Sequence, residues 1–131
     1  MTKILLVDDE QDILDLLTIF VEGILNEEDE IIKATSGNKA VMLMQSQGPV
    51  DCVISDYNMP DGQGIVVQQY LLDNKINIPF YICTAHDVSF LKKNLPVPPI
   101  DFIFKPFNFA RIKEIVKKHM GWFAIFIGNS G

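Results

Sequence analysis

One carboxylate ends an apolar run in the middle of the chain. In the stretch ISDYNMPDG, residues 54–62, Asp56 follows Val53 and Ile54, and an asparagine, a proline, a second aspartate and a glycine come shortly after it. A buried strand that ends on a carboxylate has three readings: the acid caps a helix or turn, binds a metal, or reacts. The stretch by itself leaves all three open.

Four other polar side chains follow apolar runs in the same way. Asp8 and Asp9 come directly after KILLV, Thr84 ends PFYICT, and Lys105 follows DFIF. These runs have the length and composition of short strands buried on both faces. If the strands are parallel, side chains at their carboxyl ends meet at one edge of the sheet. The sequence therefore predicts one site that gathers three carboxylates, a hydroxyl and an ammonium group.

The elements that would position these residues alternate along the chain. The predicted strands cover residues 3–7, 30–35, 51–55, 79–84 and 101–104. The predicted helices cover residues 12–26, 37–47, 65–72, 87–94 and 109–119. Because the connections are crossovers, we expect a single doubly wound α/β domain, with a five-stranded parallel sheet and helices on both faces.

Helical spacing also predicts which residues turn toward the core. In the first helix these are Ile13, Leu16, Leu17, Phe20, Val21 and Ile24. In the third and last helices they are Ile65, Val66, Gln69, Leu72, Ile112, Ile115 and Val116. Ser36 is predicted to cap the second helix and Gly48 to end it. Gly62 and Gly64 fit a turn better than a phosphate-binding loop, because they follow the third strand and not the first.

Three carboxylates in one crevice need a cation, because like charges a few ångströms apart raise one another's pKa. Oxygen ligands without histidine or thiolate favour a hard divalent ion, so Mg²⁺ is the predicted metal, with Mn²⁺ able to substitute. Lys105 and Thr84 add a positive charge and a hydroxyl donor that suit phosphoryl oxygens. Asp56 at the centre is then a nucleophile toward an activated phosphoryl group.

Size and charge argue against other classes of protein. The 131 residues suit one domain with its own core. The formal charge of -6 argues against a nucleic-acid surface, which needs clustered Lys and Arg. The chain has no leader-like N-terminus and no apolar run near the ~20 residues of a spanning helix, so we expect a cytoplasmic protein without membrane insertion.

The motifs ILLVDDE, ISDYNMPDGQG, CTA and DFIFKPF, in this order and spacing, resemble the receiver domain of two-component response regulators. The single-domain chemotaxis regulator is the simplest relative, and its strand order 2-1-3-4-5 is the order the resemblance implies. The implied domain covers residues 1–120. Asp56 would accept a phosphoryl group from a sensor histidine kinase, a phosphotransfer protein or a small acyl phosphate. The implied function is a phosphorelay signalling switch and not an enzyme that turns over a separate substrate.

The resemblance implies a set of Mg²⁺ ligands. Asp9 and Asp56 would bind the ion directly, the backbone carbonyl of Asn58 would be a third ligand, and Asp8 would act through water. A simpler interpretation of two aspartates after a strand is that they cap the following helix. Lys105 likewise has a reading as an exposed loop lysine.

The resemblance also implies a switch beside the site. Lys105 would contact the phosphoryl group, Thr84 would move toward it, and Phe102 would be the aromatic side chain that rotates. Phe102 could instead be an ordinary core residue, because it lacks the hydroxyl that a tyrosine would offer to solvent. The bond between Lys105 and Pro106 would be cis.

Two further residues are predicted to tune the lifetime of the phosphorylated state. Asn58 and His86 lie two positions beyond Asp56 and Thr84, over the mouth where a hydrolytic water would approach. We expect His86 to make the decay rate depend on pH near its ordinary pKa of about 6.5.

Two segments depart from the family pattern. The prolines of NLPVPPI should end the fourth helix by Asn94 and keep the chain extended through Pro99. We expect residues 84–119 to be read by a protein partner or by a second copy of the chain, and not by DNA. The apolar tail at 121–131 is a cloning remnant, a packed extension, or an edge strand that recruits a partner.

Two other functions compete with the switch. A degenerate receiver could act only as an interaction scaffold, although the complete set of Asp9, Asp56, Thr84 and Lys105 argues against it. A Mg²⁺-dependent phosphatase could also form an aspartyl-phosphate on an α/β sheet. Such enzymes carry an Asp-x-Asp pair after the first strand, which VDDEQ lacks.

Overall fold

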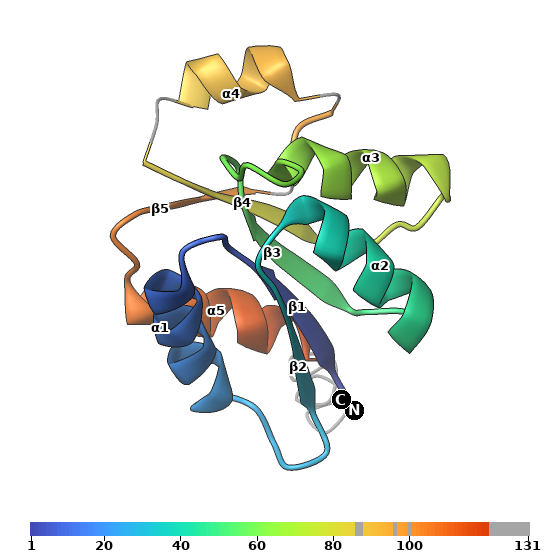
Figure 1. Cartoon of the computed structure of the whole chain (residues 1–131). Helices are drawn as coiled ribbons and strands as arrows, with labels where there is room; N and C mark the ends of the chain where they lie inside the picture. The colour runs from blue at the N-terminus through green and yellow to red at the C-terminus, as the bar shows by residue number, and fades with distance from the viewer. Residues whose placement is uncertain (86–87, 96, 100, 121–131) are drawn as a thin grey trace, which may run out of the picture.

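Strands and helices alternate along the chain in the computed structural model, which describes residues 1–85, 88–95, 97–99 and 101–120 (Figure 1). The strands are β1 (Lys3–Val7), β2 (Glu30–Ala34), β3 (Cys52–Asp56), β4 (Phe80–Thr84) and β5 (Asp101–Phe104). The helices are α1 (Gln11–Glu22), α2 (Gly37–Gln47), α3 (Gly64–Asp73), α4 (Val88–Asn94) and α5 (Phe109–His119). The predicted order of elements is confirmed.

The five strands form one parallel sheet in the order β2-β1-β3-β4-β5. This confirms the predicted topology. The register brings the carboxyl ends of the strands to a common edge: Val7 pairs with Ser55, Asp56 with Cys83, and Thr84 with Phe104. Side chains just beyond these positions therefore face one another.

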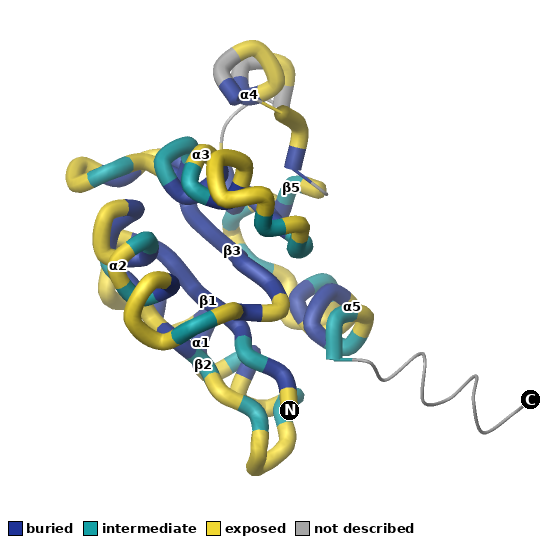
Figure 2. The backbone as a smooth tube through the Cα atoms, turned by 90° about the vertical axis from the view of Figure 1, so that its right-hand side faces the viewer, coloured by how far each residue is buried: buried dark blue, intermediate teal, exposed yellow. Residues whose placement is uncertain are grey.

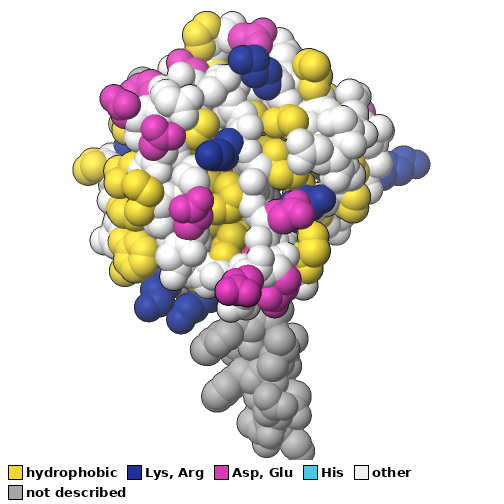
Figure 3. Space-filling view, turned by 60° about the horizontal axis from the view of Figure 1, so that its bottom comes forward, with side chains coloured by type: hydrophobic (Ala, Val, Ile, Leu, Met, Phe, Trp, Pro, Cys, Tyr) yellow, Lys and Arg dark blue, Asp and Glu magenta, His cyan; other side chains and the backbone are white. Residues whose placement is uncertain are grey.

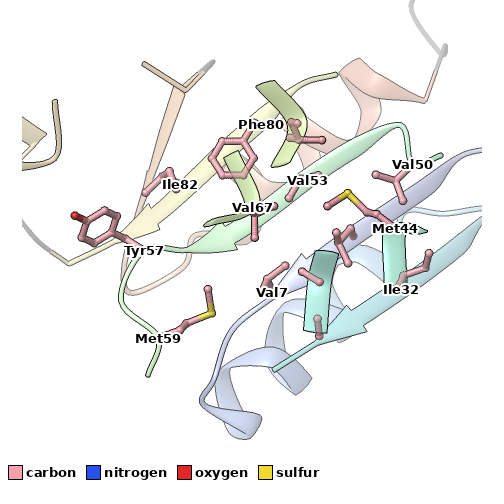
Figure 4. Packing of buried hydrophobic residues seen from close by; sticks show 14 of the residues in the cluster. Val7, Ile32, Met44, Val50, Val53, Tyr57, Met59, Val67, Phe80 and Ile82 are labelled. Carbon is pink, nitrogen blue, oxygen red and sulfur yellow. The ribbon is translucent and has the colours of Figure 1, made fainter. Parts of the chain in front are cut away.

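Helices cover both faces of the sheet, as predicted. Side chains from β1, β3 and β4 alternate between two buried clusters, one under α2, α3 and α4 and the other under α1 and α5. Figure 4 shows the first cluster, where Val7, Val53 and Ile82 point toward the same side as Met44 and Val67. The central strands are buried along their length and the outer surfaces of the helices are exposed (Figure 2).

The predicted inward faces of two helices are partly wrong. In α1, Leu16 is 40% exposed and the buried stripe is Leu14, Leu17, Thr18 and Val21. In α3, Gln69 and Leu72 are exposed, Ile65 and Val66 are half-buried, and the buried residues are Gly64, Val67, Gln68 and Leu71. Both helices carry apolar residues around much of their circumference, so spacing alone does not determine which face meets the sheet.

The helix ends follow local chemistry. The Ser36 hydroxyl accepts a hydrogen bond from the Lys39 backbone N–H at 3.1 Å, and Gly48 leaves α2 with φ of 85°, both as predicted. The predicted end of α1 near Asn26 is wrong, because the helix ends at Glu22 and the chain continues as a turn in which the Leu25 N–H donates to the Val21 carbonyl.

The end of α4 and the inward face of α5 agree with the sequence predictions. Helix α4 ends at Asn94, before the proline-rich segment, and Ile112, Ile115 and Val116 of α5 are buried. None of the described helices is both long enough and apolar enough to span a bilayer. The tail at 121–131 lies outside the described residues.

Candidate functional site

Three carboxylates meet where β1 and β3 end. One carboxylate oxygen from each of Asp8, Asp9 and Asp56 lies within 4.8 Å of the other two. Asp8 and Asp56 are buried, and Asp9 is exposed. The sheet register brings residues that are far apart in the sequence into one cluster, which is the convergence predicted from the sequence.

The Lys105 side chain reaches into this cluster from the end of β5. Its Nζ lies 3.1 Å from Oδ2 of Asp8 and 3.4 Å from Oδ1 of Asp56. The Lys105 backbone N–H donates to the Thr84 carbonyl at 2.9 Å, and the following bond to Pro106 is cis, as the resemblance implied. Because its side chain is only 19% exposed, Lys105 is not an exposed loop lysine.

A small pocket of about 250 Å³ opens at Asp56. Its lining is Glu10, Asp56, Tyr57, Asn58, Thr84, Ala85 and Lys105. Thr84 is buried and Asn58 is exposed. The pocket thus combines two carboxylates, an ammonium and a hydroxyl in a space suited to a group of a few atoms.

Burial raises the pKa of Asp56 to about 6, and the negative charge of Asp8 adds to that rise. The charge and hydrogen bond of Lys105, and the Tyr57 backbone N–H that donates to Oδ1 at 2.9 Å, oppose it. A single lysine therefore does not balance the two buried carboxylates. Three oxygen-donor side chains with excess negative charge are a donor set that fits a hard divalent cation.

The loop after Asp56 is tied to the start of α2. Asp61 accepts hydrogen bonds from the Asn38 side-chain amide and the Ser36 hydroxyl, each at 2.9 Å, and these bonds lower its pKa. The Gly37 N–H donates to the Gly62 carbonyl at 2.7 Å, and Gly62 has φ of 83°, which confirms the predicted turn at Gly62. The predicted turn at Gly64 is wrong, because Gly64 is the first residue of α3. Sequence spacing did not predict this contact, because its partners are about 25 residues apart.

Gly64 lets α3 begin directly against the backbone of Asp56. A Cβ at this position would lie 2.5 Å from the Asp56 carbonyl oxygen, whereas a Cβ at Gly23 would meet no atom closer than 3.6 Å. We expect Gly64→Ala to lower the free energy of unfolding by roughly 1–3 kcal/mol, because backbone must move to relieve the overlap. Urea unfolding checks this, with Gly23→Ala as the matched control. Equal stability of the two variants would contradict it.

The structure tests the predicted switch residue Phe102 and the predicted lifetime residue His86 less completely. Phe102 is half-buried and packs against the cluster under α2, α3 and α4, which is compatible with both the core and the switch reading. His86 lies outside the described residues. The hydrogen bond from the Tyr57 backbone N–H to Asp56 was not predicted, because a main-chain donor cannot be recognised from the type of side chain. Glu10, which lines the pocket, was not predicted either.

Comparison with known proteins points to one family. The profile of the response regulator receiver domain matches residues 4–117. Response regulator SaeR of Staphylococcus aureus is 32% identical over 112 residues, which cover 82% of this chain and 46% of SaeR. The chain thus spans about half the length of the curated relatives it matches.

Solved structures agree on the fold. The Francisella response regulator 1452 receiver domain has a TM-score of 0.76 and 25% identity, over 90% of this chain and 95% of that one. The Vibrio cholerae chemotaxis protein CheY4 has a TM-score of 0.73 and 23% identity, over 92% of this chain and 99% of its own. With a family profile that covers most of its length, the chain belongs to the response regulator receiver domain family.

Proposed function

We propose that this chain is a phosphorylation-activated switch whose phosphoacceptor is Asp56. The observation that carries the proposal is the position of Lys105 Nζ, 3.1 Å from Asp8 and 3.4 Å from Asp56, beside the cluster of three carboxylates. A cation and an ammonium around one carboxylate offset the charge of an incoming phosphoryl group, so that the carboxylate can attack phosphorus.

The donor is a phosphohistidine of a sensor histidine kinase or phosphotransfer protein, or a small acyl phosphate. The bond from the histidine nitrogen to phosphorus breaks as a bond from an Asp56 carboxylate oxygen to phosphorus forms, and the nitrogen later takes up a proton. Lys105 holds a phosphoryl oxygen, and the Thr84 hydroxyl donates to another. The chain acts on its own side chain and turns over no separate substrate.

Mg²⁺ fits the carboxylate cluster, with Asp9 and Asp56 as direct ligands, the Asn58 backbone carbonyl as a third, and Asp8 acting through water. The ion would supply positive charge to the phosphoryl oxygens. Mn²⁺ has similar ligand preferences and would substitute. Residues 1–120 are the proposed receiver unit, with 121–131 as a separate tail.

Mg²⁺ is expected to stabilise the folded chain, because it binds the cluster only when the strands are assembled. At a concentration 100 times the dissociation constant the gain is about 2.7 kcal/mol. In Asp9→Ala this gain should be lost, since a direct ligand is removed, while Asp12→Ala, which changes an exposed α1 carboxylate outside the cluster, should keep it. Thermal melting with Mg²⁺ or EDTA measures both, and an unchanged Mg²⁺ response in Asp9→Ala would show that Asp9 is not a ligand.

Phosphorylation is proposed to draw the Thr84 hydroxyl toward Asp56 and let Phe102 turn inward, which changes the surface formed by α4, β5 and α5. A downstream protein or a second copy would read this surface. With beryllium fluoride as a phosphoryl mimic and Mg²⁺, amide exchange should change within residues 84–119 and not only around Asp9 and Asp56. Asp56→Asn under the same conditions should show no change. Exchange confined to the site loops would favour the scaffold reading.

The proposed function is tested by intact-mass measurement after incubation with acetyl phosphate. One phosphoryl group per chain is expected with Mg²⁺ and none with EDTA. Absence of any labelling, despite a melting response to Mg²⁺, would favour the scaffold. Steady turnover of an unrelated phosphomonoester would favour a phosphatase.

A further inference from the structure

A second hollow lies at the opposite edge of the molecule from β5, along the edge strand β2. It has a volume of about 450 Å³, and residues of α1, β2 and α2 line it. Figure 1 shows α1 and α2 on either side of β2. Its lining is Gln11, Leu14, Lys33, Ala34, Thr35, Lys39, Met42, Leu43 and Ser46. None of these residues lines the pocket at Asp56.

The floor of this groove is the outer edge of β2. Alternate residues of a strand direct their backbone groups to opposite sides. The Glu30 N–H and the Ala34 carbonyl bond toward the β1 side, to Thr2 and Asp8. The N–H and carbonyl of Lys33 therefore point outward, where no further strand lies among the described residues. This edge offers a main-chain donor and acceptor to an added strand.

The groove has a largely apolar surface, with one lysine on its β2 floor and one on its α2 wall. Leu14 lies on the α1 side, and Met42, which is 65% exposed, on the α2 side. Ile31 and Lys33 are two residues apart in β2, so their side chains point to the same face of the sheet. Ile31 packs under α1 and α5, and Lys33 therefore lies on the α1 side, whereas Lys39 belongs to α2. Neither lysine forms an ion pair within the described part of the chain.

These two lysines give the groove a positive charge in a chain whose net charge is negative. The chain carries a net charge of -6, and on the face seen in Figure 3 acidic, basic and hydrophobic side chains alternate without a large basic area. A second copy is a poor occupant of the groove, because it would place its own Lys33 against this one and its own α1 and α2 against the walls.

We propose that the β2 groove binds an extended peptide segment of a partner protein, added as a strand along β2. The segment carries two adjacent acidic residues flanked by apolar ones. Neighbouring side chains of a strand point to opposite faces, so one acidic residue reaches Lys33 and the next reaches Lys39. Main-chain bonds to Lys33 supply affinity, and the two lysines select for acidic sequence. The groove is separate from the site of phosphorylation.

The probe is the capped hexapeptide Thr-Val-Glu-Glu-Val-Thr, titrated into the full chain and followed by amide chemical shifts. Shifts are expected in β2 and in the facing sides of α1 and α2, with slowed exchange of the Lys33 N–H. The capped peptide Thr-Val-Lys-Lys-Val-Thr should bind at least about tenfold more weakly. Equal binding of the two peptides, or shifts elsewhere, would overturn the proposal.

Variants separate the charge from the backbone contact. Lys33→Ala and Lys39→Ala should each weaken binding several-fold, while Lys113→Ala, an exposed lysine on α5, should not. Lys33→Pro removes an outward N–H and not a ladder bond, so it should bind about tenfold more weakly than Lys33→Ala. Equal affinity of these two variants would overturn strand addition.

A second measurement does not depend on the folding of the proline variant. A peptide with N-methylated glutamate amides keeps its charges but loses its donors, and it should bind at least about tenfold more weakly than the parent peptide. Undiminished binding would also overturn strand addition. Sedimentation of the chain alone is expected to show a monomer. A dimer that is lost in Lys33→Pro would mean that a second copy of the chain occupies the groove, and it would overturn the proposal.

Discussion

Asp56→Asn is expected to take up no phosphoryl group from acetyl phosphate and Mg²⁺ under conditions in which the unmodified chain takes up one. The neutral amide keeps the size of the side chain and can still accept from the Tyr57 N–H, which donates to Oδ1 at 2.9 Å. It lacks the negatively charged oxygen that attacks phosphorus. The expected loss is therefore a loss of chemistry in an intact fold, and intact-mass measurement over time quantifies it.

The matched control is Asp73→Asn at the end of α3. Asp73 is exposed, accepts a hydrogen bond from the Gln69 amide, and is not part of the carboxylate cluster. This variant should be labelled at the rate of the unmodified chain. If Asp56→Asn is labelled at that rate too, the phosphoacceptor is another residue, and peptide mapping of the labelled chain would identify it.

Much of the site could be predicted because it is built from strand ends. Each of Asp8, Asp56, Thr84 and Lys105 ends or follows an apolar run, and parallel strands in one sheet must bring those ends together. The prediction needed only the strands and their parallel order. The predicted strands and their parallel order remain correct even where a predicted boundary is off by one residue. For example, β3 begins at Cys52 and not at the predicted residue 51.

The parts that were wrong or missed depend on packing between distant segments. Leu16 and Leu14 are equally apolar, and only the position of α1 on the sheet buries Leu14 and leaves Leu16 exposed. Asp61 accepts hydrogen bonds from Ser36 and Asn38. All three are residue types that are common in loops, so the sequence did not indicate that they would bond to one another. Periodicity describes one element at a time and cannot choose between such arrangements.

The same Asp56→Asn change is expected to stabilise the metal-free chain, and by an amount that depends on pH. The ordinary pKa of the carboxyl is 3.8, and in the folded chain burial and then the charge of Asp8 raise it to about 6. Between these values the folded state binds more protons than the unfolded state, so stability falls as pH rises. Above the folded pKa the full cost of the buried charge is present, on the order of 3 kcal/mol for a rise of about two units.

Asparagine carries no charge, so it escapes this cost, while Lys105 keeps Asp8 as a partner at 3.1 Å. In EDTA, Asp56→Asn should therefore be more stable than the unmodified chain by a few kcal/mol near about pH 8, and the difference should shrink toward zero below about pH 4. Urea unfolding at several pH values measures the difference, with Asp73→Asn as the control that shows none. Mg²⁺ supplies the missing positive charge to the unmodified chain, so it should narrow the gap at high pH. A gap that does not change with pH would mean that the carboxylate cluster is already balanced in the folded chain without a metal.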